Sequence, residues 1–245
     1  MRAPRALPLF ASVVAGAVAV AGFAPIGAWP LPAVSLAVLF ALLARTSSTR
    51  RGFALGYAWG LGFFLAGVSW VYVSLAVYGG MAPWLAALAT LLFCAFLALF
   101  PAAVGALQAR WPGSPALRLV GVMPLAWSAT EWVRGWLFTG FPWLVAGYSQ
   151  VPSSPLAGYA PVIGVYGVSF LLALIAALLA WAVSFAAAWR GRAWALAGIA
   201  VLAVGGQALR GVAWTSADGP PTTVALLQGN IPQDMKWRPE KTLAT

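Results

Sequence analysis

The stretch FALGYAWGLGFFLAGVSWVYVSLAV, residues 53–77, contains no charged residue along its whole length. At about 1.5 Å per residue, a helix of this length exceeds the ~30 Å hydrocarbon core of a bilayer. A segment slightly longer than the bilayer is thick can still cross it by tilting. The stretch therefore predicts a transmembrane helix.

Six further apolar segments flank this stretch. Each approaches the roughly 17–25 residues that a transmembrane helix needs. The second segment along the chain is short, and we expect it to tilt little or to be partly re-entrant. We therefore expect about seven spans, at residues 7–23, 29–44, 53–77, 83–108, 117–133, 160–188 and 193–212.

The composition of the whole chain supports a membrane protein. Of its 245 residues, 62% are hydrophobic and 7% are charged, whereas soluble proteins carry roughly 25% charged residues. Glu131 is the only acidic residue before Asp218. The net charge of +10 does not indicate a nucleic-acid partner, because the basic residues lie in short clusters between apolar runs. A bilayer is the solvent that tolerates this composition.

The arginines predict the orientation of the spans. One side of an alternating seven-span path holds Arg134 and Arg210, at span ends. Positive charge stays in the cytoplasm, so we expect a cytoplasmic N-terminus and an extracytoplasmic segment after Arg210. The other side of the path holds Arg2, Arg5, Arg45, Arg50, Arg51, Arg110, Arg118, Arg190 and Arg192.

Residues 1–23 have a second interpretation, as a cleaved signal peptide. Arg2 and Arg5 would form its basic region, and Ala17-Val18-Ala19 resembles a cleavage site. Removing this segment would leave an even number of spans and break the match with the arginines. An uncleaved first helix is the simpler interpretation.

Small residues indicate where helices meet. Gly52, Gly56 and Gly60 recur every four residues, a spacing that lets two helix backbones approach closely; a path for lipid tails is the alternative. Cys94 is the only cysteine and lies within an apolar segment, so we expect a packing residue. The chain has no histidine, and we expect neither a metal site nor a cofactor.

The segment EWVRGWLFTGFPWLVAGYSQVPSSP, residues 131–155, interrupts the apolar pattern. Glu131 and Arg134 share a helix face and could pair, either as a structural ion pair or as part of a polar substrate site. Trp143 and Tyr148 would belong to the interfacial aromatic belt or contact a ligand. The turn at residues 140–143 contains glycine and proline, and predicts an ordered or re-entrant loop on the outer face.

The composition changes after Arg210. We predict a transmembrane domain over residues 1–212 and a polar, extracytoplasmic linker over 213–221. Residues 222–245 then begin with TTVALLQGN, which predicts a buried strand, followed by a proline-punctuated loop. An apolar strand needs both faces covered, so we expect this stub to belong to a fold that continues beyond Thr245.

Two motifs now indicate a family. EWVRGWLFTGFPWLVAGYSQ (131–150) and VALLQGNIPQDMKW (224–237) resemble the apolipoprotein N-acyltransferases. The resemblance implies a bacterial inner-membrane enzyme whose second half is a periplasmic nitrilase-like domain, an αββα sandwich, followed by a last transmembrane helix. It also implies a reaction in which a phospholipid acyl chain passes through a cysteine thioester to the α-amine of a diacylglyceryl apolipoprotein.

The resemblance assigns few residues. It places Trp237 near the active-site cavity, with packing against the outer domain as the alternative role, and gives supporting roles to residues of the first motif: Glu131, Arg134, Trp143 and Tyr148.

No catalytic residue is assigned in this chain. The family's glutamate, lysine and cysteine are expected beyond Thr245, because Cys94 lies in the membrane and the acidic and basic residues after 230 come too early. We therefore expect residues 1–245 to be inactive alone. Two other classes remain open: a transporter or channel, and a membrane anchor for an unrelated outer domain.

Overall fold

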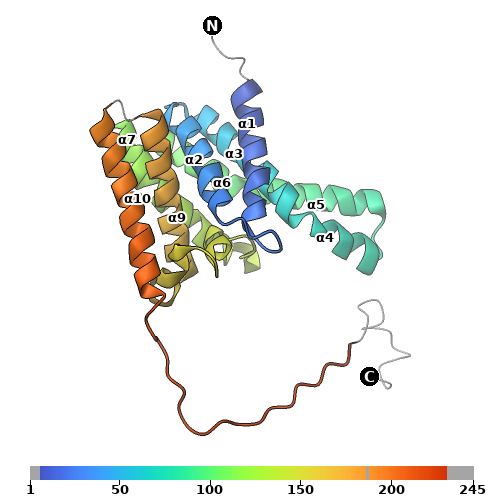
Figure 1. The fold of residues 1–245 in the computed structure, drawn as a ribbon. Coiled ribbons are helices and arrows are strands. Elements are labelled where there is room, and N and C mark those ends of the chain that lie inside the picture. Colours follow the sequence, from blue (N-terminus) through green and yellow to red (C-terminus); the bar gives the residue numbers. More distant parts are fainter. Residues whose placement is uncertain (1–5, 186–187, 231–245) are drawn as a thin grey trace.

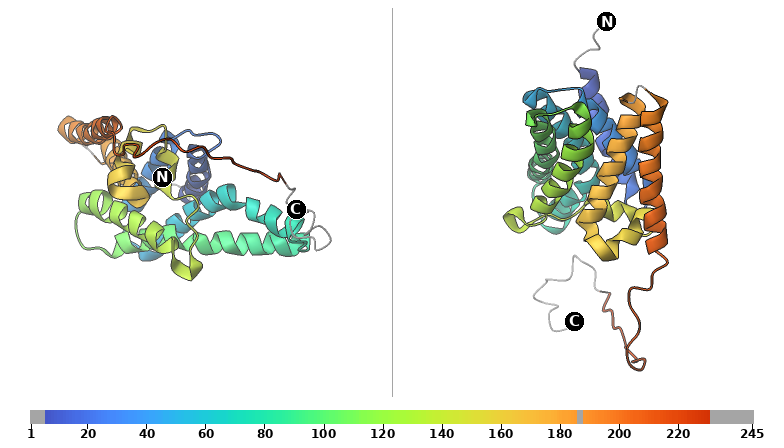
Figure 2. Two further views of the ribbon diagram at one scale, coloured as in Figure 1. Left: turned by 90° about the horizontal axis from the view of Figure 1, so that it is seen from below. Right: turned by 90° about the vertical axis from the view of Figure 1, so that its left-hand side faces the viewer.

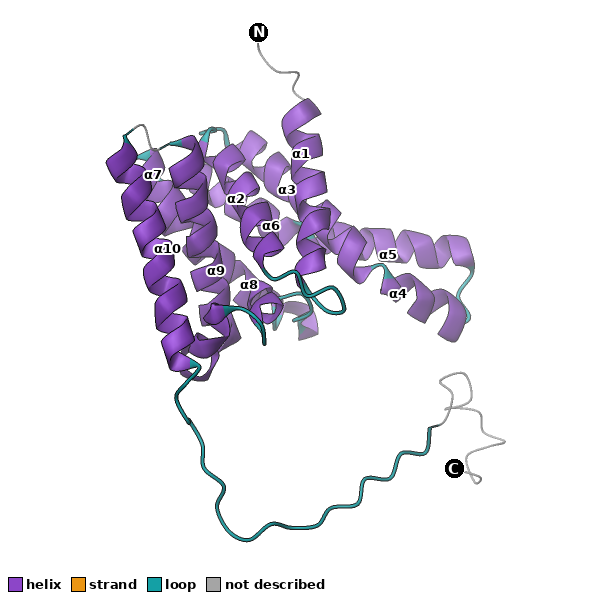
Figure 3. Cartoon of the chain, in the orientation of Figure 1, coloured by secondary structure: helices purple, strands orange, loops and turns teal. Residues whose placement is uncertain are grey.

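The computed structural model describes residues 6–185 and 188–230. Every regular element in those residues is helical, and they form no strand (Figure 1 and Figure 3). The all-α architecture predicted for the membrane region is thereby confirmed. The elements are α1 (Ala6–Ala19), η1 (Val20–Gly22), α2 (Pro30–Ala44), α3 (Thr49–Val68), α4 (Trp70–Val73), η2 (Ser74–Tyr78), α5 (Pro83–Leu97), α6 (Leu99–Arg110), α7 (Pro115–Leu117), η3 (Arg118–Val122), α8 (Met123–Arg134), η4 (Leu137–Thr139), η5 (Ala146–Gln150), η6 (Pro155–Tyr159), α9 (Ala160–Ser184) and α10 (Trp189–Leu209).

Helix α3 contacts helices on two sides, and glycine lets both approach. On one side it packs against α6: a Cβ added at Gly52 would collide with the carbonyl oxygen of Gly105, and one at Gly56 with that of Pro101. On the other side it packs against α1, where a Cβ on Gly16 would meet the carbonyl oxygen of Trp59. The predicted glycine stripe is therefore a helix-packing surface.

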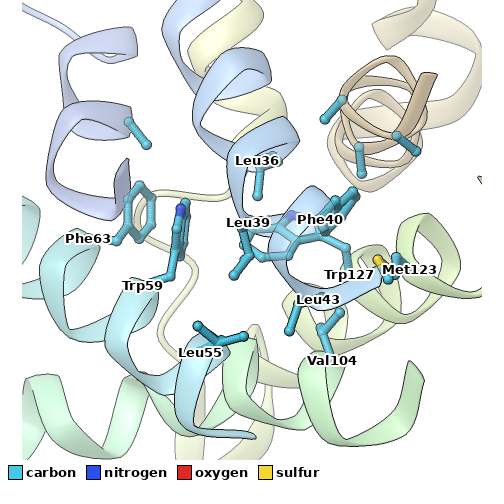
Figure 4. Packing of buried hydrophobic residues seen from close by; sticks show 14 of the residues in the cluster. Leu36, Leu39, Phe40, Leu43, Leu55, Trp59, Phe63, Val104, Met123 and Trp127 are labelled. Atoms are coloured by element: carbon cyan, nitrogen blue, oxygen red, sulfur yellow. The ribbon is translucent and has the colours of Figure 1, made fainter. Parts of the chain in front are cut away.

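Aromatic and aliphatic side chains fill the centre of the bundle (Figure 4). The ring of Trp59 lies edge-to-face on Trp127, with centroids 5.2 Å apart, and its indole Nε1 donates a 2.9 Å hydrogen bond to the Ser35 hydroxyl. Ser35 in turn donates to the backbone carbonyl of Ala15. This chain of bonds gives the buried Trp59 and Ser35 side chains hydrogen-bond partners and joins α1, α2 and α3.

Three helical segments in the described residues are long and apolar enough to cross a membrane: Pro83–Arg110, Pro155–Ser184 and Trp189–Leu209. A fourth is possible by length if Thr49–Val68 and Trp70–Tyr78, which meet at a 46° bend, form one span. Figure 2 shows α4 and α5 reaching sideways from the rest of the bundle beyond this bend. These segments correspond to four of the seven spans expected from the sequence.

The other three expected spans are shorter or broken. Helix α2 has 15 residues, so it rises only ~22 Å against the ~30 Å of a hydrocarbon core. The apolar helix Ala6–Gly22 is also short, and a π-helical turn at η3 interrupts the segment around 117–133. Seven spans therefore remain a prediction, although the described residues are helical in all seven segments.

The arginine-rich segments gather at one end of the bundle. Figure 1 shows the start of α1, the α2–α3 turn and the start of α10 at this end, while the chain leaves α10 at the opposite end. Buried Gln108 ties the arginine-rich end together: its Nε2 donates to the Leu43 carbonyl at 3.1 Å, and its Oε1 accepts from Arg118 at 3.4 Å. The same guanidinium donates to the Thr46 carbonyl.

The strand expected after α10 is not seen in the described residues. Residues 222–230 are exposed and form no strand, although the sequence predicted one there (Figure 3). A strand needs a partner for its backbone N–H and C=O groups, and the backbone of 222–230 makes no hydrogen bond with the described residues. Whether 213–221 and 222–245 belong to a second domain stays a prediction.

Candidate functional site

The polar segment singled out in the sequence connects α8 to α9. It begins where α8 ends at Arg134, passes through η4, η5 and η6, and lies at the end of the bundle from which the chain leaves α10 (Figure 1). Arg210, which follows α10, donates from Nη1 to the carbonyls of Ser153 and Ser154. We call residues 135–159 the α8–α9 loop.

Glu131 is buried beneath this loop, with 5% of its surface exposed. Its Oε1 accepts a 2.9 Å hydrogen bond from the backbone amide of Ala146, at the start of η5. The Ser169 hydroxyl and the Trp127 indole also lie beside the carboxylate. A buried carboxylate surrounded by donors is a strong anchor for a loop, because charge-assisted hydrogen bonds are stronger than neutral ones.

Arg134 is buried as well, with 3% of its surface exposed. Its Nη1 donates to two loop carbonyls, at 2.7 Å to Phe141 and 2.6 Å to Trp143, and the guanidinium lies 5.4 Å from the centre of the Phe64 ring. Glu131 and Arg134 therefore bind the loop and make no direct salt bridge with each other in the described structure. The direct ion pair, one of the two roles that the sequence left open for them, does not form.

The turn held by Arg134 has an unusual backbone. Phe138, Thr139 and Leu144 all have positive φ (51°, 73° and 59°), a region that residues with a Cβ rarely adopt. Gly140 also has positive φ, and a Cβ there would collide with the Gly135 carbonyl. Such conformations persist only where the surroundings enforce them, which agrees with the ordered loop predicted from the glycine and proline.

Polar side chains fix the second half of the loop. Ser169 on α9 accepts a 2.8 Å hydrogen bond from the Gly147 amide. Gln150, which is 1% exposed, donates from Nε2 to the Trp29 carbonyl and to the Ser149 hydroxyl. Sequence reasoning missed Ser169, because serine is common within apolar helices and nothing in its neighbourhood marks a partner.

Trp143 and Tyr148 lie on the surface of the loop instead. They are 54% and 53% exposed. Trp143 stacks on Phe141 at 5.1 Å and meets Trp70 at 6.3 Å. The four described site residues thus form two groups, a buried pair under the loop and an exposed aromatic pair on it. Trp237 lies outside the described residues.

A groove of about 410 Å³ opens beside the clamped turn. Its walls are mostly aromatic and aliphatic, and the buried Arg134 also lines it. The polar support of the loop and an apolar surface for a ligand therefore meet at one place. The lining residues from α5, α6 and the loop are Phe93, Phe96, Leu97, Phe100, Leu137, Phe138, Thr139, Gly140 and Phe141.

This arrangement can now be compared with known proteins. Residues 15–178, from within α1 into α9, match the family model described as the apolipoprotein N-acyltransferase N-terminal domain. The chain belongs to the apolipoprotein N-acyltransferase family. The matched residues include α8 and the whole α8–α9 loop, so the site described above lies within the part that defines the family's N-terminal domain.

Individual apolipoprotein N-acyltransferases match almost the whole chain. The protein of Nitrosomonas europaea is 47% identical over 97% of this chain and 47% of its own length. That of Methylococcus capsulatus is 49% identical over 91% of this chain and 44% of its own length, and that of Chromobacterium violaceum is 45% identical over 95% and 44%. The chain thus spans about half the length of the curated relatives it matches.

Proposed function

We propose that this chain is the membrane half of an enzyme that transfers an acyl chain from a phospholipid to the N-terminal diacylglyceryl-cysteine of apolipoproteins. The observation that carries the proposal is the match of residues 15–178 to the N-terminal domain of a family named for this activity. The helices that are long and apolar enough to cross a membrane, together with the ordered α8–α9 loop at one end of the bundle, support this proposal. The bacterial inner membrane is the corresponding location, with the residues after α10 on the periplasmic side.

The proposed reaction has two steps. A cysteine thiolate attacks the ester carbonyl of the phospholipid, the acyl–oxygen bond breaks, and a lysophospholipid leaves as the thioester forms. The α-amine of the apolipoprotein then attacks the thioester, the carbon–sulfur bond breaks, an amide forms and the amine proton passes to a base. Cys94 does not suit the first step, because it is fully buried in α5 and its sulfur lies 3.5 Å from the Phe64 carbonyl.

The residues of this chain then have supporting roles. Glu131 and Arg134 act as positioning residues that hold the α8–α9 loop. Trp143 and Tyr148 present rings at the membrane surface, where amphipathic aromatic side chains are favoured, and contact the lipid substrates. Trp237 contributes to substrate handling near the catalytic domain.

The packed interior supports this function over a transporter. Trp59, Trp127 and Phe40 occupy the centre of the bundle, and the ring of Trp127 contacts the rings of the other two (Figure 4). A transport path would have to displace these side chains. A simple membrane anchor for an unrelated outer domain would not need the structured α8–α9 loop. It would also not explain why the loop falls within the segment that matches the family.

A chimera tests the proposal. Residues 1–245 would be joined to the remaining C-terminal part of the Nitrosomonas europaea relative and reconstituted with a labelled phospholipid and a diacylglyceryl peptide. We expect the chimera to N-acylate the peptide and residues 1–245 alone to give only background. A chimera that inserts and folds but transfers no acyl chain, beside an active intact relative, would contradict the proposal, and so would transfer by residues 1–245.

A further inference from the structure

A small cavity lies between α8 and the neighbouring helices α3 and α6. Its volume is about 10 Å³. By this measure a site needs on the order of 10–15 Å³ to admit a single water molecule. Larger ligands do not fit, so the size of the cavity already restricts its occupant.

The polar residues that line this cavity come from one face of α8: Trp127, Thr130, Glu131 and Arg134. Their spacing of three and four residues places them one above another on the helix. The remaining lining residues are Trp59, Phe63, Phe64, Phe100 and Pro101. The cavity is thus apolar on all sides except the α8 face.

Two complementary atoms on this face are buried and make no hydrogen bond of good geometry within the described residues: the acceptor Glu131 Oε2 and the donor Trp127 Nε1. The Trp127 indole nevertheless lies beside the carboxylate. Unsatisfied buried polar groups cost stability, and native proteins commonly satisfy them with a buried water that makes about three hydrogen bonds. An acceptor and a donor facing one cavity form a suitable pair for such a water.

Thr130 and Arg134 are the other two polar residues that line the cavity. The Thr130 hydroxyl donates to the Trp127 carbonyl, so its oxygen keeps lone pairs that can accept. Arg134 also lines the cavity, and its two bonds to the loop both come from Nη1. The cavity therefore offers two kinds of donor and two kinds of acceptor, which matches the two donors and two acceptors of water.

We propose that this cavity binds one ordered water molecule that bridges Glu131 and Arg134. The water accepts hydrogen bonds from Trp127 and Arg134 and donates to Glu131 and Thr130. The two charged residues are then a water-mediated ion pair, while their other atoms hold the loop at Ala146 and Trp143. A bridging water is enthalpically nearly equivalent to a direct hydrogen bond.

A structure that resolves ordered water tests this proposal without relying on enzyme activity. The whole 1–245 chain would be studied in lipid nanodiscs with a bound antibody fragment. We expect one water peak within about 3.2 Å of both Glu131 Oε2 and Trp127 Nε1. A direct Glu131–Arg134 salt bridge, a direct Trp127–Glu131 hydrogen bond in place of the water, or a dry cavity would overturn the proposal.

Variants test which residues bind the water. Trp127→Phe combined with Thr130→Val removes one donor and one acceptor with little change in volume, and we expect the peak to disappear. Trp132→Phe, on the exposed side of the same helix, is the matched control and should keep it. A peak that survives the double variant would show that these two residues do not bind the water. Should the double variant not fold, the unaltered chain alone decides.

Discussion

The carboxylate of Glu131 accepts a hydrogen bond at 2.9 Å from the backbone amide of Ala146, 15 residues further along the chain. This contact joins the last turn of α8 to the start of η5. Together with the bonds from Arg134 to the Phe141 and Trp143 carbonyls, it makes the α8–α9 loop part of the helical core.

Replacing Glu131 should weaken the fold. Glu131→Ala leaves the buried Ala146 amide without an acceptor and Arg134 without a nearby negative charge, and we expect a loss of about 3 kcal/mol. Glu131→Gln can still accept the bond and should lose less. The measurement is the midpoint of SDS-induced unfolding in mixed micelles. Asp218→Asn, at an exposed position, is the control; equal midpoints for it and Glu131→Ala would refute the anchoring role.

Arg134→Lys should loosen the loop while keeping the charge. An ammonium is a compact point charge and lacks the planar fork that reaches two carbonyls in a fixed geometry. We expect amide hydrogen exchange over residues 137–144 to accelerate by about tenfold, which corresponds to the loss of ~1.4 kcal/mol. Arg50→Lys, at an exposed site near the start of α3, should leave exchange in the loop unchanged. Unaltered exchange in Arg134→Lys would argue against the clamp.

Gly52→Ala should destabilise the bundle. The added Cβ would collide with the carbonyl oxygen of Gly105, a backbone atom that cannot rotate away, and such overpacking typically costs about 1–3 kcal/mol. Gly198→Ala on α10 is the matched control, because its nearest neighbour is the flexible end of the Leu178 side chain at 3.3 Å. The same SDS titration compares them. If both substitutions behaved alike, α3 and α6 could not be in close contact at Gly52.

Gln108→Leu should destabilise the arginine-rich end. The substitution removes a donor to the Leu43 carbonyl and the acceptor for buried Arg118, so we expect a cost of about 2 kcal/mol. Gln207→Leu, at an exposed position on α10, makes the same chemical change without these partners and should be near neutral in the same SDS titration. A neutral Gln108→Leu would mean that the network contributes nothing to stability.

Trp143→Ala or Tyr148→Ala should slow acyl transfer in the chimera more than it alters stability. Both rings are about half exposed, so truncation leaves little cavity. Loss of an aromatic contact with lipid should reduce the rate by about tenfold, or ~1.4 kcal/mol. Trp194→Ala, at an exposed tryptophan on α10, should keep the rate of the unmodified chimera. Unchanged rates in both loop variants would remove these residues from the substrate site.

Local patterns predicted much of the fold. Apolar runs without charge, such as residues 53–77, predicted helices correctly, because a chain in lipid must satisfy its backbone within each helix. The spacing of Gly52, Gly56 and Gly60 likewise predicted a close helix contact. The same patterns overestimated the length of some helices. Pro30–Ala44 is apolar but has only 15 residues, because an apolar run does not by itself mark the residues at which a helix begins and ends.

The candidate site was predicted in location but not in its contacts. The sequence marked Glu131, Arg134, Trp143 and Tyr148 as one polar and aromatic segment, and the structure separates them into a buried pair and an exposed pair. Residues three apart on a helix are close enough to pair, so the sequence spacing allowed a direct ion pair. In the structure, the carbonyls of Phe141 and Trp143 bind Arg134 and the amide of Ala146 binds Glu131. The sequence does not show that the loop brings these backbone groups close to the two side chains.

The sequence by itself determined the membrane composition, the helical segments and the motifs typical of the family, because these depend on local order along the chain. Only the tertiary structure decided that Glu131 binds Ala146 and that Arg134 binds Phe141 and Trp143. It also showed that residues 222–230 form no strand with the other described residues. Hydrogen-bond partners are chosen by distance in space, and buried polar groups take whichever partner the fold brings within reach.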